Sequence, residues 1–415
     1  MRILLVHNRY RSAAPSGENR VVDQERAALS ALGHDVELFE RRSDDIDGWS
    51  TARKASVPAR VVRSPGTRRD LAAHLRRFRP DVAHVHNTFP LLSASVLHAC
   101  RDEHVPVVAT LHNYKLLCAS GDFFRAGQVC HDCAGGAVRP ALVHGCYRGS
   151  ALATVPVTVG TVANRRAWRG LVSAYIFLSE AQRLLMAGLA LDAERVFVKP
   201  NFVPRPDVTP PPVRRRAVAY IGRLDEAKGV PLLLDGWDRY RALAGDDAMR
   251  LVVAGGGPLA DRVARWAADR PSVELAGHLD RRACQELLAG VRAVLLPSQW
   301  EETFGLVVAE AMAVGTPPVA AAHGSFPELV TPGRDGALFA PGDPDDLARV
   351  VADVDAYPER YESYGGRGAT TFAERFDVRH NLERLLDIYR YAVANPVYGA
   401  PRAAPVVRMR SHGSS

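Results

Sequence analysis

The sequence predicts an α/β protein built from two doubly wound parallel-sheet domains that face a central crevice. Short apolar runs of strand length alternate with helical segments along most of the 415 residues, which is the pattern of βαβ units. The alternation stops at a proline-rich and arginine-rich passage, residues 204–216, and then starts again. A chain of this length is long enough for two domains of about 100–200 residues each.

The predicted strands are short, rich in Val, Ile and Leu, and apolar on both faces, as expected for buried parallel strands. In the first half they lie at 3–7, 36–39, 82–86, 107–111, 175–178 and 196–199. In the second half they lie at 218–221, 251–254, 273–275, 294–296 and 318–321. Ligands bind such sheets beyond the carboxyl ends of the strands, so the crevice between the halves is the expected site.

These patterns divide the chain into four parts. We expect a first domain over residues 1–203, with an excursion rich in cysteine at 114–150, and a second domain over 204–375. A closing helix at 376–396 is expected to pack back on the first domain, and 397–415 has the composition of a disordered tail.

The net charge of +7 favours anionic ligands such as phosphates, but the excess is too diffuse to indicate nucleic-acid binding. No apolar stretch reaches the roughly 20 residues of a membrane span, and no signal peptide is evident, so we expect a cytoplasmic protein. The arginines between Arg60 and Arg79 fit a solvated helix face or a peripheral membrane contact. Oligomeric state leaves no signal in the sequence.

The segment from Pro297 to Val330 carries the sharpest signal. A strand ending at Leu296 leads through a polar turn into a helix expected to begin near Phe304. The amides of Phe304, Gly305 and Leu306 would then be free at the positive end of the helix, and Gly305 would let an anion approach the backbone. This arrangement predicts a phosphate site.

Glu302 lies just before this predicted helix, and Glu310 lies about two turns inside it. At a rise of about 1.5 Å per residue the two carboxylates are about 12 Å apart. Carboxylates this far apart do not share a proton and exceed the separation of about 5–9.5 Å in glycoside hydrolases. They fit opposite ends of a nucleotide diphosphate sugar, the transferred sugar and the ribose. Ordinary polar residues on a helix are the alternative.

This segment resembles the E-x7-E motif of the family 4 retaining glycosyltransferases, whose GT-B fold contains two Rossmann-like domains. The likeness covers almost the whole chain, including the IGRLDEAKG, VVAGGGPL and KPNFV segments. It implies that Glu310 holds the ribose and Glu302 contacts the donor sugar. It also implies that the first domain lies on the acceptor side and the second binds the nucleotide sugar.

Arg223 and Lys228 follow a predicted strand and precede a helix, so both cations can reach the diphosphate across the crevice. The resemblance implies that this pair neutralises the leaving diphosphate, so no catalytic metal is expected. A solvated pair of cations on a loop is the alternative. Gly257 lies in a strand-to-helix turn expected to shape the crevice wall, and His278 resembles the family segment that lies beside the base.

On the acceptor side, Ser16, Gly17, Glu18 and Asn19 open a helix after the first strand and resemble the family's glycine loop. Ser16 occupies the place of the first of two glycines, so Gly17 is the residue carried over. His112, at the end of the strand in PVVATLHN, matches the family histidine that faces the reacting sugar. The alternative for His112 is packing at a strand end.

Four cysteines follow His112 closely. Cys130 and Cys133 form a C-x2-C pair, and Cys118 and Cys146 flank it about a dozen residues away on each side. Four thiolates suit a closed structural zinc site, although the outer spacings match no common finger. Free thiols or a redox pair are the alternatives. A zinc-bound loop here would form part of the acceptor site.

The sequence therefore predicts a retaining glycosyltransferase that moves a hexose or N-acetylhexosamine from a nucleotide sugar, UDP-N-acetylglucosamine by preference, to a hydroxyl group. We expect a small hydrophilic or glycan acceptor, such as an aminocyclitol antibiotic precursor, because no apolar patch is obvious. A lipid-linked acceptor of the cell envelope is the alternative, favoured by the basic helix. Two other classes remain as rivals, a sugar-nucleotide epimerase and a zinc-dependent nucleic-acid binder.

Overall fold

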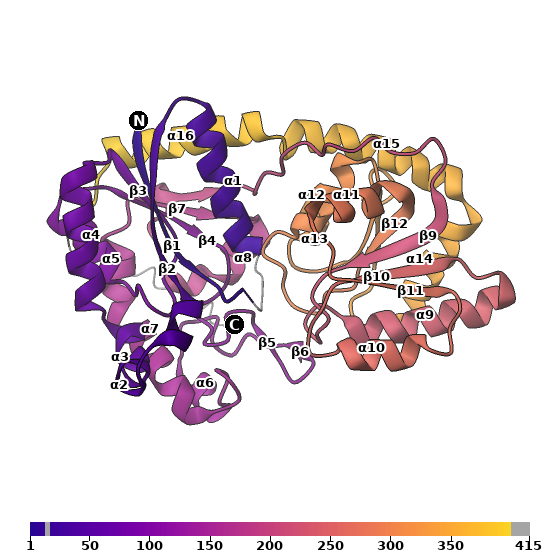
Figure 1. Ribbon diagram of the computed structural model, residues 1–415, viewed down its shortest axis with the longest axis horizontal. Coiled ribbons are helices and arrows are strands. Elements are labelled where there is room, and N and C mark those ends of the chain that lie inside the picture. The colour runs from indigo at the N-terminus through magenta and orange to yellow at the C-terminus, as the bar shows by residue number, and fades with distance from the viewer. Residues whose placement is uncertain (13–16, 400–415) are drawn as a thin grey trace, which may run out of the picture.

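The computed structural model describes residues 1–12 and 17–399. It contains two six-stranded parallel sheets, each covered by helices on both faces, which lie side by side (Figure 1). The strand order is β2-β1-β3-β4-β7-β8 in the first sheet and β11-β10-β9-β12-β13-β14 in the second. The predicted fold class of two doubly wound parallel-sheet domains is confirmed. The predicted tail, 397–415, lies almost wholly outside the described residues.

The first domain contains every strand-like run predicted for the first half. Its sheet consists of β1 (Arg2–Arg9), β2 (Asp35–Arg42), β3 (Val82–Asn87), β4 (Val107–Leu111), β7 (Ala174–Phe177) and β8 (Val196–Val198). Its helices are α1 (Gly17–Ala31), α2 (Thr51–Ala55), α3 (Val57–Val62), α4 (Pro65–Phe78), α5 (Ser95–Asp102), α6 (Arg139–Val143), α7 (Ala151–Gly170) and α8 (Glu180–Leu185). A small antiparallel hairpin, β5 (Phe124–Arg125) and β6 (Gln128–Val129), lies in the cysteine-rich excursion.

The second domain repeats this architecture. Its strands are β9 (Arg215–Ile221), β10 (Arg250–Ala254), β11 (Val273–Gly277), β12 (Val291–Leu296), β13 (Pro318–Ala321) and β14 (Ala337–Phe339). Its helices are α9 (Val230–Ala244), α10 (Ala260–Ala267), α11 (Arg281–Gly290), α12 (Leu306–Ala313), α13 (Phe326–Leu329), α14 (Pro344–Ala356) and α15 (Pro358–Arg375). Our strand prediction omitted β14 (Ala337–Phe339).

Both faces of each sheet are buried, as the apolar strand runs predicted. Along β1, Leu4 and Val6 join one hydrophobic cluster, while Ile3 and Leu5 join another on the opposite face. Successive side chains of a strand point to opposite faces, so a strand between two helical layers is apolar over most of its length. The buried polar residues near the end of β1, His7 and Asn8, are hydrogen-bonded to Asn19 and Ser43 respectively. The sheets are therefore rigid supports for the loops at their carboxyl ends.

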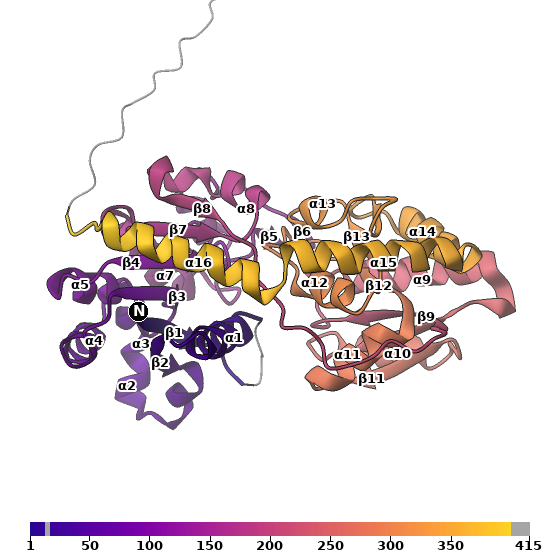
Figure 2. The ribbon, with the colours of Figure 1, turned by 90° about the horizontal axis from the view of Figure 1, so that it is seen from above.

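The C-terminal helices connect the two domains (Figure 2). Helix α15 lies over the second domain, and α16 (Val378–Ala394) crosses to the first. There Leu382 and Leu385 are buried in the same cluster as Ile3 and Leu5. Asp377 caps α16 by accepting from the Arg379 amide, and this fixes where the helix begins. The chain thus crosses between the domains twice.

The described residues contain no helix that is long and apolar enough to cross a membrane.

Candidate donor and acceptor site

A cavity of about 1530 Å³ lies between the two domains. It is bounded on one side by the loops after β1 and β4, and on the other by the loops after β9 and β12. Direct contacts close the cavity at its base: the Thr303 hydroxyl donates to the His112 carbonyl over 3.0 Å, and the Tyr114 hydroxyl donates to the Glu301 carbonyl over 2.9 Å.

Eight of the predicted site residues line this cavity: Gly17, His112, Arg223, Lys228, Glu302, Phe304, Gly305 and Leu306. Glu310, Gly257 and His278 are not among its lining residues. The fold therefore brings most of the predicted site together from segments up to 289 positions apart, between Gly17 and Leu306.

The helix after β12 begins at Leu306, two residues later than predicted. Gly305 has a φ of 81°, and a Cβ atom there would lie 2.6 Å from the Phe326 ring. Left-handed backbone and the close ring both require glycine, so the regular helix cannot start before Gly305. The Phe304 side chain is buried in the core rather than placed at a ligand. The amides of Leu306 and Val307 then precede the first helical bond, from Val308 to Gly305.

Glu302 is buried beside the cavity and is held by two donors. Its Oε1 atom accepts from Lys228 Nζ at 2.6 Å and from the Ser298 hydroxyl at 2.7 Å. Burial alone would raise the pKa of Glu302, but Lys228 and Ser298 outweigh this effect and hold the pKa below its usual value. Glu302 is therefore ionised at neutral pH and is not a general acid.

The cation pair lies on the loop between β9 and α9. Arg223 is more than half exposed and pairs with Asp225, whose other oxygen accepts from the Lys228 amide at 2.8 Å. Asp225 thus shapes the loop that presents both cations, a role that the sequence analysis missed. Its position inside IGRLDEAKG, between two cations, was the available signal. A Cβ atom on Gly229 would lie 1.7 Å from the Pro297 carbonyl oxygen, so this loop packs tightly against the Glu302 segment.

Glu310 faces a different neighbour. Its carboxylate lies 2.9 Å from Arg20 on α1, across the boundary between the domains. Burial raises the pKa of Glu310, while Arg20 and Arg281 oppose the rise. The predicted separation of about 12 Å applied the helical rise to the whole span from Glu302 to Glu310. Since α12 begins only at Leu306, the first half of this span is not helical. The two carboxylates nevertheless have no binding partner in common, and a shared proton is excluded.

Gly257 and His278 occupy other positions than the cavity wall. A Cβ atom on Gly257 would lie 2.5 Å from the Leu224 carbonyl oxygen, so this glycine lets the turn after β10 pack under the cation loop. Gly257 therefore packs against the loop that carries Arg223 and Lys228 but does not itself line the cavity. His278 is exposed just after β11, at the edge of the sheet that the resemblance assigns to the base.

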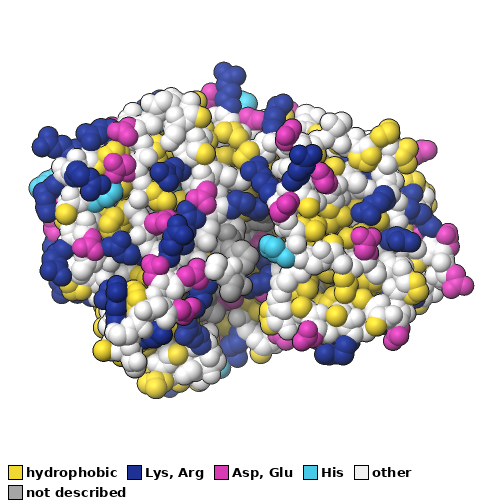
Figure 3. All heavy atoms as spheres, viewed as in Figure 1, with side chains coloured by type: hydrophobic (Ala, Val, Ile, Leu, Met, Phe, Trp, Pro, Cys, Tyr) yellow, Lys and Arg dark blue, Asp and Glu magenta, His cyan; other side chains and the backbone are white. Residues whose placement is uncertain are grey.

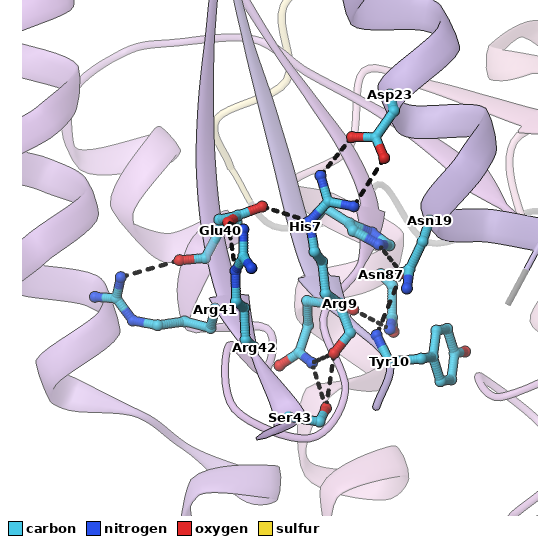
Figure 4. A network of polar contacts seen from close by, with 11 residues as sticks. His7, Arg9, Tyr10, Asn19, Asp23, Glu40, Arg41, Arg42, Ser43 and Asn87 are labelled. Atoms are coloured by element: carbon cyan, nitrogen blue, oxygen red, sulfur yellow. Dashed lines mark hydrogen bonds and ion pairs between the residues drawn. The ribbon is translucent and has the colours of Figure 1, made fainter. Parts of the chain in front are cut away.

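On the acceptor side, Figure 4 shows how the end of β1 holds the start of α1. The Asn19 side-chain oxygen bonds His7 Nε2 at 2.8 Å and accepts from the Tyr10 amide at 3.2 Å. Gly17 begins α1, and a Cβ atom on it would lie 3.0 Å from the Leu306 side chain. Glycine at this position therefore lets α1 approach the start of α12. Ser16 lies outside the described residues.

His112 directly follows β4, and its ring lies in a buried chain of polar groups. Its Nε2 atom lies 2.9 Å from His86 Nδ1, and His86 Nε2 lies 3.3 Å from the Glu25 carboxylate. Burial lowers the pKa of His112 to about 3, with smaller effects of His7 and Lys199. His112 is therefore neutral at physiological pH and acts through hydrogen bonds rather than charge. His86 and Glu25 were not predicted to take part, although His86 lies in the DVAHVHN strand end.

Two further titratable groups lie on the acceptor side: Glu18, which was considered less firmly than Gly17 in the glycine loop, and Lys115, which was not predicted. Glu18 accepts from the Asn113 amide at 2.8 Å, and burial raises the pKa of Glu18 to about 7. Burial also lowers the pKa of Lys115 to about 8. Both line the cavity. Perturbed pKa values at a cavity wall make both side chains candidate site residues.

The four cysteines of the excursion line a second, small cavity of about 10 Å³. In the described part of the chain only Glu25, His84 and His86 bring three ligand atoms within 4.8 Å of one another, so no three of the four sulfurs do. The histidine group already has other partners: Lys199 Nζ lies 3.7 Å from the Glu25 carboxylate, and the two ring nitrogens of His84 bond the hydroxyls of Tyr389 and Thr110. Zinc at the cysteines stays a prediction, and it requires the sulfurs to move together.

Metal analysis of the purified protein checks this prediction. We expect one zinc ion per chain in the wild type and in Cys284→Ser, whose thiol lies on α11 outside the cluster. The double variant Cys130→Ser/Cys133→Ser should lose the metal, because two thiolates rarely hold zinc in a closed site. Wild-type protein with no zinc and four reactive thiols in the excursion would end the hypothesis.

Two parallel-sheet domains that enclose a cation pair and a helix start define the class of two-domain transferases acting on nucleotide sugars. Two family models match the chain in succession: Glycosyltransferase Family 4 over residues 15–205 and Glycosyl transferases group 1 over residues 215–354. The chain belongs to this glycosyltransferase family. Membership supports the transferase over the epimerase and the nucleic-acid binder.

Curated relatives agree. A D-inositol 3-phosphate glycosyltransferase of Mycolicibacterium smegmatis is 32% identical over 205 residues, which cover 48% of this chain and 44% of that protein. The chain thus spans less than half the length of the relatives of this kind. A glycogen synthase of Mycobacterium tuberculosis is 28% identical over 397 residues, covering 85% of this chain and 86% of that protein.

The fold is also found in solved structures. The Anabaena Alr3699/HepE protein in complex with UDP matches with a TM-score of 0.62 and 18% identity, covering 93% of this chain and 99% of that protein.

Proposed function

We propose that this protein transfers a sugar from a UDP-sugar to an acceptor hydroxyl with retention of anomeric configuration. The observation that carries the proposal is the Lys228–Glu302 pair, which lies opposite the start of α12 in the interdomain cavity. A fixed cation and free amides can bind the leaving diphosphate, and the carboxylate beside them can hydrogen-bond the sugar. UDP as the nucleotide is supported by the Anabaena protein, which was solved with UDP and with UDP-glucose.

Each residue then has a role in binding the donor. Arg223 and Lys228 neutralise the diphosphate, and the amides of Leu306 and Val307 bind its oxygens. Glu302 hydrogen-bonds the transferred sugar through the oxygen that Lys228 and Ser298 leave open, and Glu310 binds the ribose. UDP-N-acetylglucosamine is the first donor to test and UDP-glucose the second.

The reaction proceeds on one face of the sugar. The bond between the anomeric carbon and the diphosphate oxygen breaks while the acceptor oxygen bonds the same carbon from the same side. The proton of the acceptor hydroxyl passes to the departing diphosphate oxygen, so the charge and atoms balance without an enzyme nucleophile. Preorganised cations stabilise the negative charge that develops on the diphosphate. His112, neutral and oriented by His86, orients the hydroxyls of the reacting sugar.

A titration of the protein with UDP and a panel of nucleotide sugars tests the donor half. We expect UDP and one UDP-sugar to bind with affinities that change less than about twofold when EDTA is added, because protein cations replace the metal. Isothermal titration calorimetry measures this directly. Binding that requires Mg²⁺, or a preference for another nucleotide, would contradict the assignment. Conversion of the donor alone into a new sugar nucleotide would instead identify an epimerase.

A further inference from the structure

Helix α7 exposes a stripe of large hydrophobic side chains. Leu152 is 83% exposed, Val155 44%, Val159 48% and Val162 51%. Their spacing of three and four residues places them on one face of the helix. We call these four residues the α7 stripe. We predicted no apolar patch from the sequence, and that prediction is wrong. Val157 lies in the same segment as the stripe but is buried, so the orientation of the helix in the fold decides which valines are exposed.

The stripe continues into the reaction cavity. Leu152, Val155 and Val159 line the same cavity as Lys228 and His112. Helix α3 packs directly beside α7, because a Cβ atom on Gly160 would lie 3.2 Å from the Val61 carbonyl oxygen. Val57 and Val61 of α3 line the cavity too. One end of the cavity is therefore an apolar trough that opens onto the surface.

Two cations on the rim of this trough have no acidic partner among the residues that the structure describes, and Asp47, which also lines the cavity, is paired with Arg11 at 2.6 Å. No Asp or Glu occurs from Gly48 to Arg69 or from Cys133 to Ser179, the segments that contain α2, α3 and α7. Lys54 and Arg148 line the cavity beside the stripe, and in the described part of the chain neither has a carboxylate within 4.0 Å. In Figure 3 hydrophobic and basic side chains lie side by side at the lower left, over α2, α3 and α6.

We propose that the acceptor is a lipid-bearing molecule with a phosphate group, whose aliphatic chain lies on the α7 stripe. This proposal rests on the proposed transferase function and names its acceptor class. The trough holds the chain, Lys54 and Arg148 hold the phosphate, and the reacting hydroxyl reaches His112. Burial of an aliphatic chain supplies affinity in proportion to its area, and the cations add attraction for the anion.

The position of the stripe argues against a permanently bound protein. A partner seated on Leu152 and Val155 would cover the acceptor end of the cavity in every turnover, whereas a substrate enters and leaves. An apolar strip with two cations at its rim also complements an amphipathic anion better than it complements an ordinary protein surface.

Farnesyl phosphate is a suitable probe because it combines a short aliphatic chain with one phosphate. We expect it to bind the wild type and inorganic phosphate to bind far more weakly. The triple variant Leu152→Ser/Val155→Ser/Val159→Ser should weaken farnesyl phosphate binding at least about tenfold through lost apolar contact. Lys54→Gln/Arg148→Gln should weaken it about fivefold or more, with a smaller effect at high salt. Isothermal titration calorimetry measures all of these constants.

The control is Leu243→Ser, a leucine of α9 in the second domain that is 72% exposed; it should bind the probe like the wild type. UDP binding by each variant separates the two proposals: intact UDP binding without farnesyl phosphate binding sinks the acceptor class alone, while failure of the wild type to bind UDP sinks the donor assignment. Three results would overturn the acceptor class. They are unchanged affinity in the triple variant, binding to anionic vesicles but not to the monomeric probe, and a wild-type dimer that the triple variant makes monomeric.

Discussion

Replacing Lys228 with alanine is expected to lower kcat by about 10²–10³-fold. Its ammonium group is fixed 2.6 Å from Glu302 and lines the cavity, so in the proposed reaction it meets the diphosphate as its negative charge grows. The loss of one preorganised donor to a developing anion typically has an effect of this size. Steady-state turnover of the UDP-sugar measures it, and Arg250→Ala, an exposed arginine at the start of β10, serves as a control with normal turnover.

The stability of Lys228→Ala distinguishes the role of Lys228 as the partner of the Glu302 charge from its role in the reaction. Without Lys228, the Ser298 hydroxyl is the one of these two donors that still bonds the buried Glu302 carboxylate. Removing one partner of a buried ion pair typically lowers stability by about 3–5 kcal/mol. The double variant Lys228→Ala/Glu302→Gln should regain that stability in urea denaturation while remaining inactive. Wild-type turnover by Lys228→Ala would refute the site assignment. Recovery of turnover in the double variant would show that the cation serves only to neutralise Glu302.

Replacing Glu310 with alanine is expected to lower kcat/KM by about 10–150-fold, largely through KM. Hydrogen bonds to a charged group contribute about 1.5–3 kcal/mol, and in the proposed complex this carboxylate holds the ribose. In the structure, however, Glu310 pairs with Arg20 of the other domain. Loss of activity in Glu310→Ala alone would therefore fit either a ribose ligand or a contact that holds the domains together.

Arg20→Ala separates these two roles. It removes the same ion pair but leaves the carboxylate in place, so UDP affinity should change less than about threefold, as expected for a partly exposed pair. If Arg20→Ala impairs the enzyme as strongly as Glu310→Ala, the carboxylate acts in domain closure and the ribose assignment is wrong. Calorimetric titration of UDP gives the affinities without reference to the acceptor.

Local sequence signals predicted the fold and much of the candidate site. Apolar runs predicted the strands because a parallel strand buried on both faces is apolar over most of its length. The start of α12 was misplaced by two residues because the constraint on Gly305 comes from the Phe326 ring. That ring is distant in the sequence and leaves no trace in the helical pattern.

Other features of the site depend on contacts between residues far apart in the sequence, and no hydrophobic pattern in the sequence predicts such contacts. Glu25 comes from α1, His86 from β3 and His112 from the loop directly after β4, and only the order of strands in the sheet makes them neighbours. The hydrogen bonds between them decide which ring nitrogen of His112 carries a proton. The cysteine spacing likewise indicated a ligand count, whereas the distances between sulfurs depend on how the excursion folds.

By itself, the sequence determined the alternation of strands and helices that forms two parallel-sheet domains. It also located the Glu302 and Glu310 motif and the cation pair as candidate site residues, because each of these signals lies within a short stretch of chain. Only the tertiary structure decided that Glu302 pairs with Lys228, that Glu310 meets Arg20 across the domains, and that α7 turns its valines toward the cavity. The reason is physical: burial and electrostatic pairing depend on distances between segments, and those distances exist only once the two domains have folded and packed together.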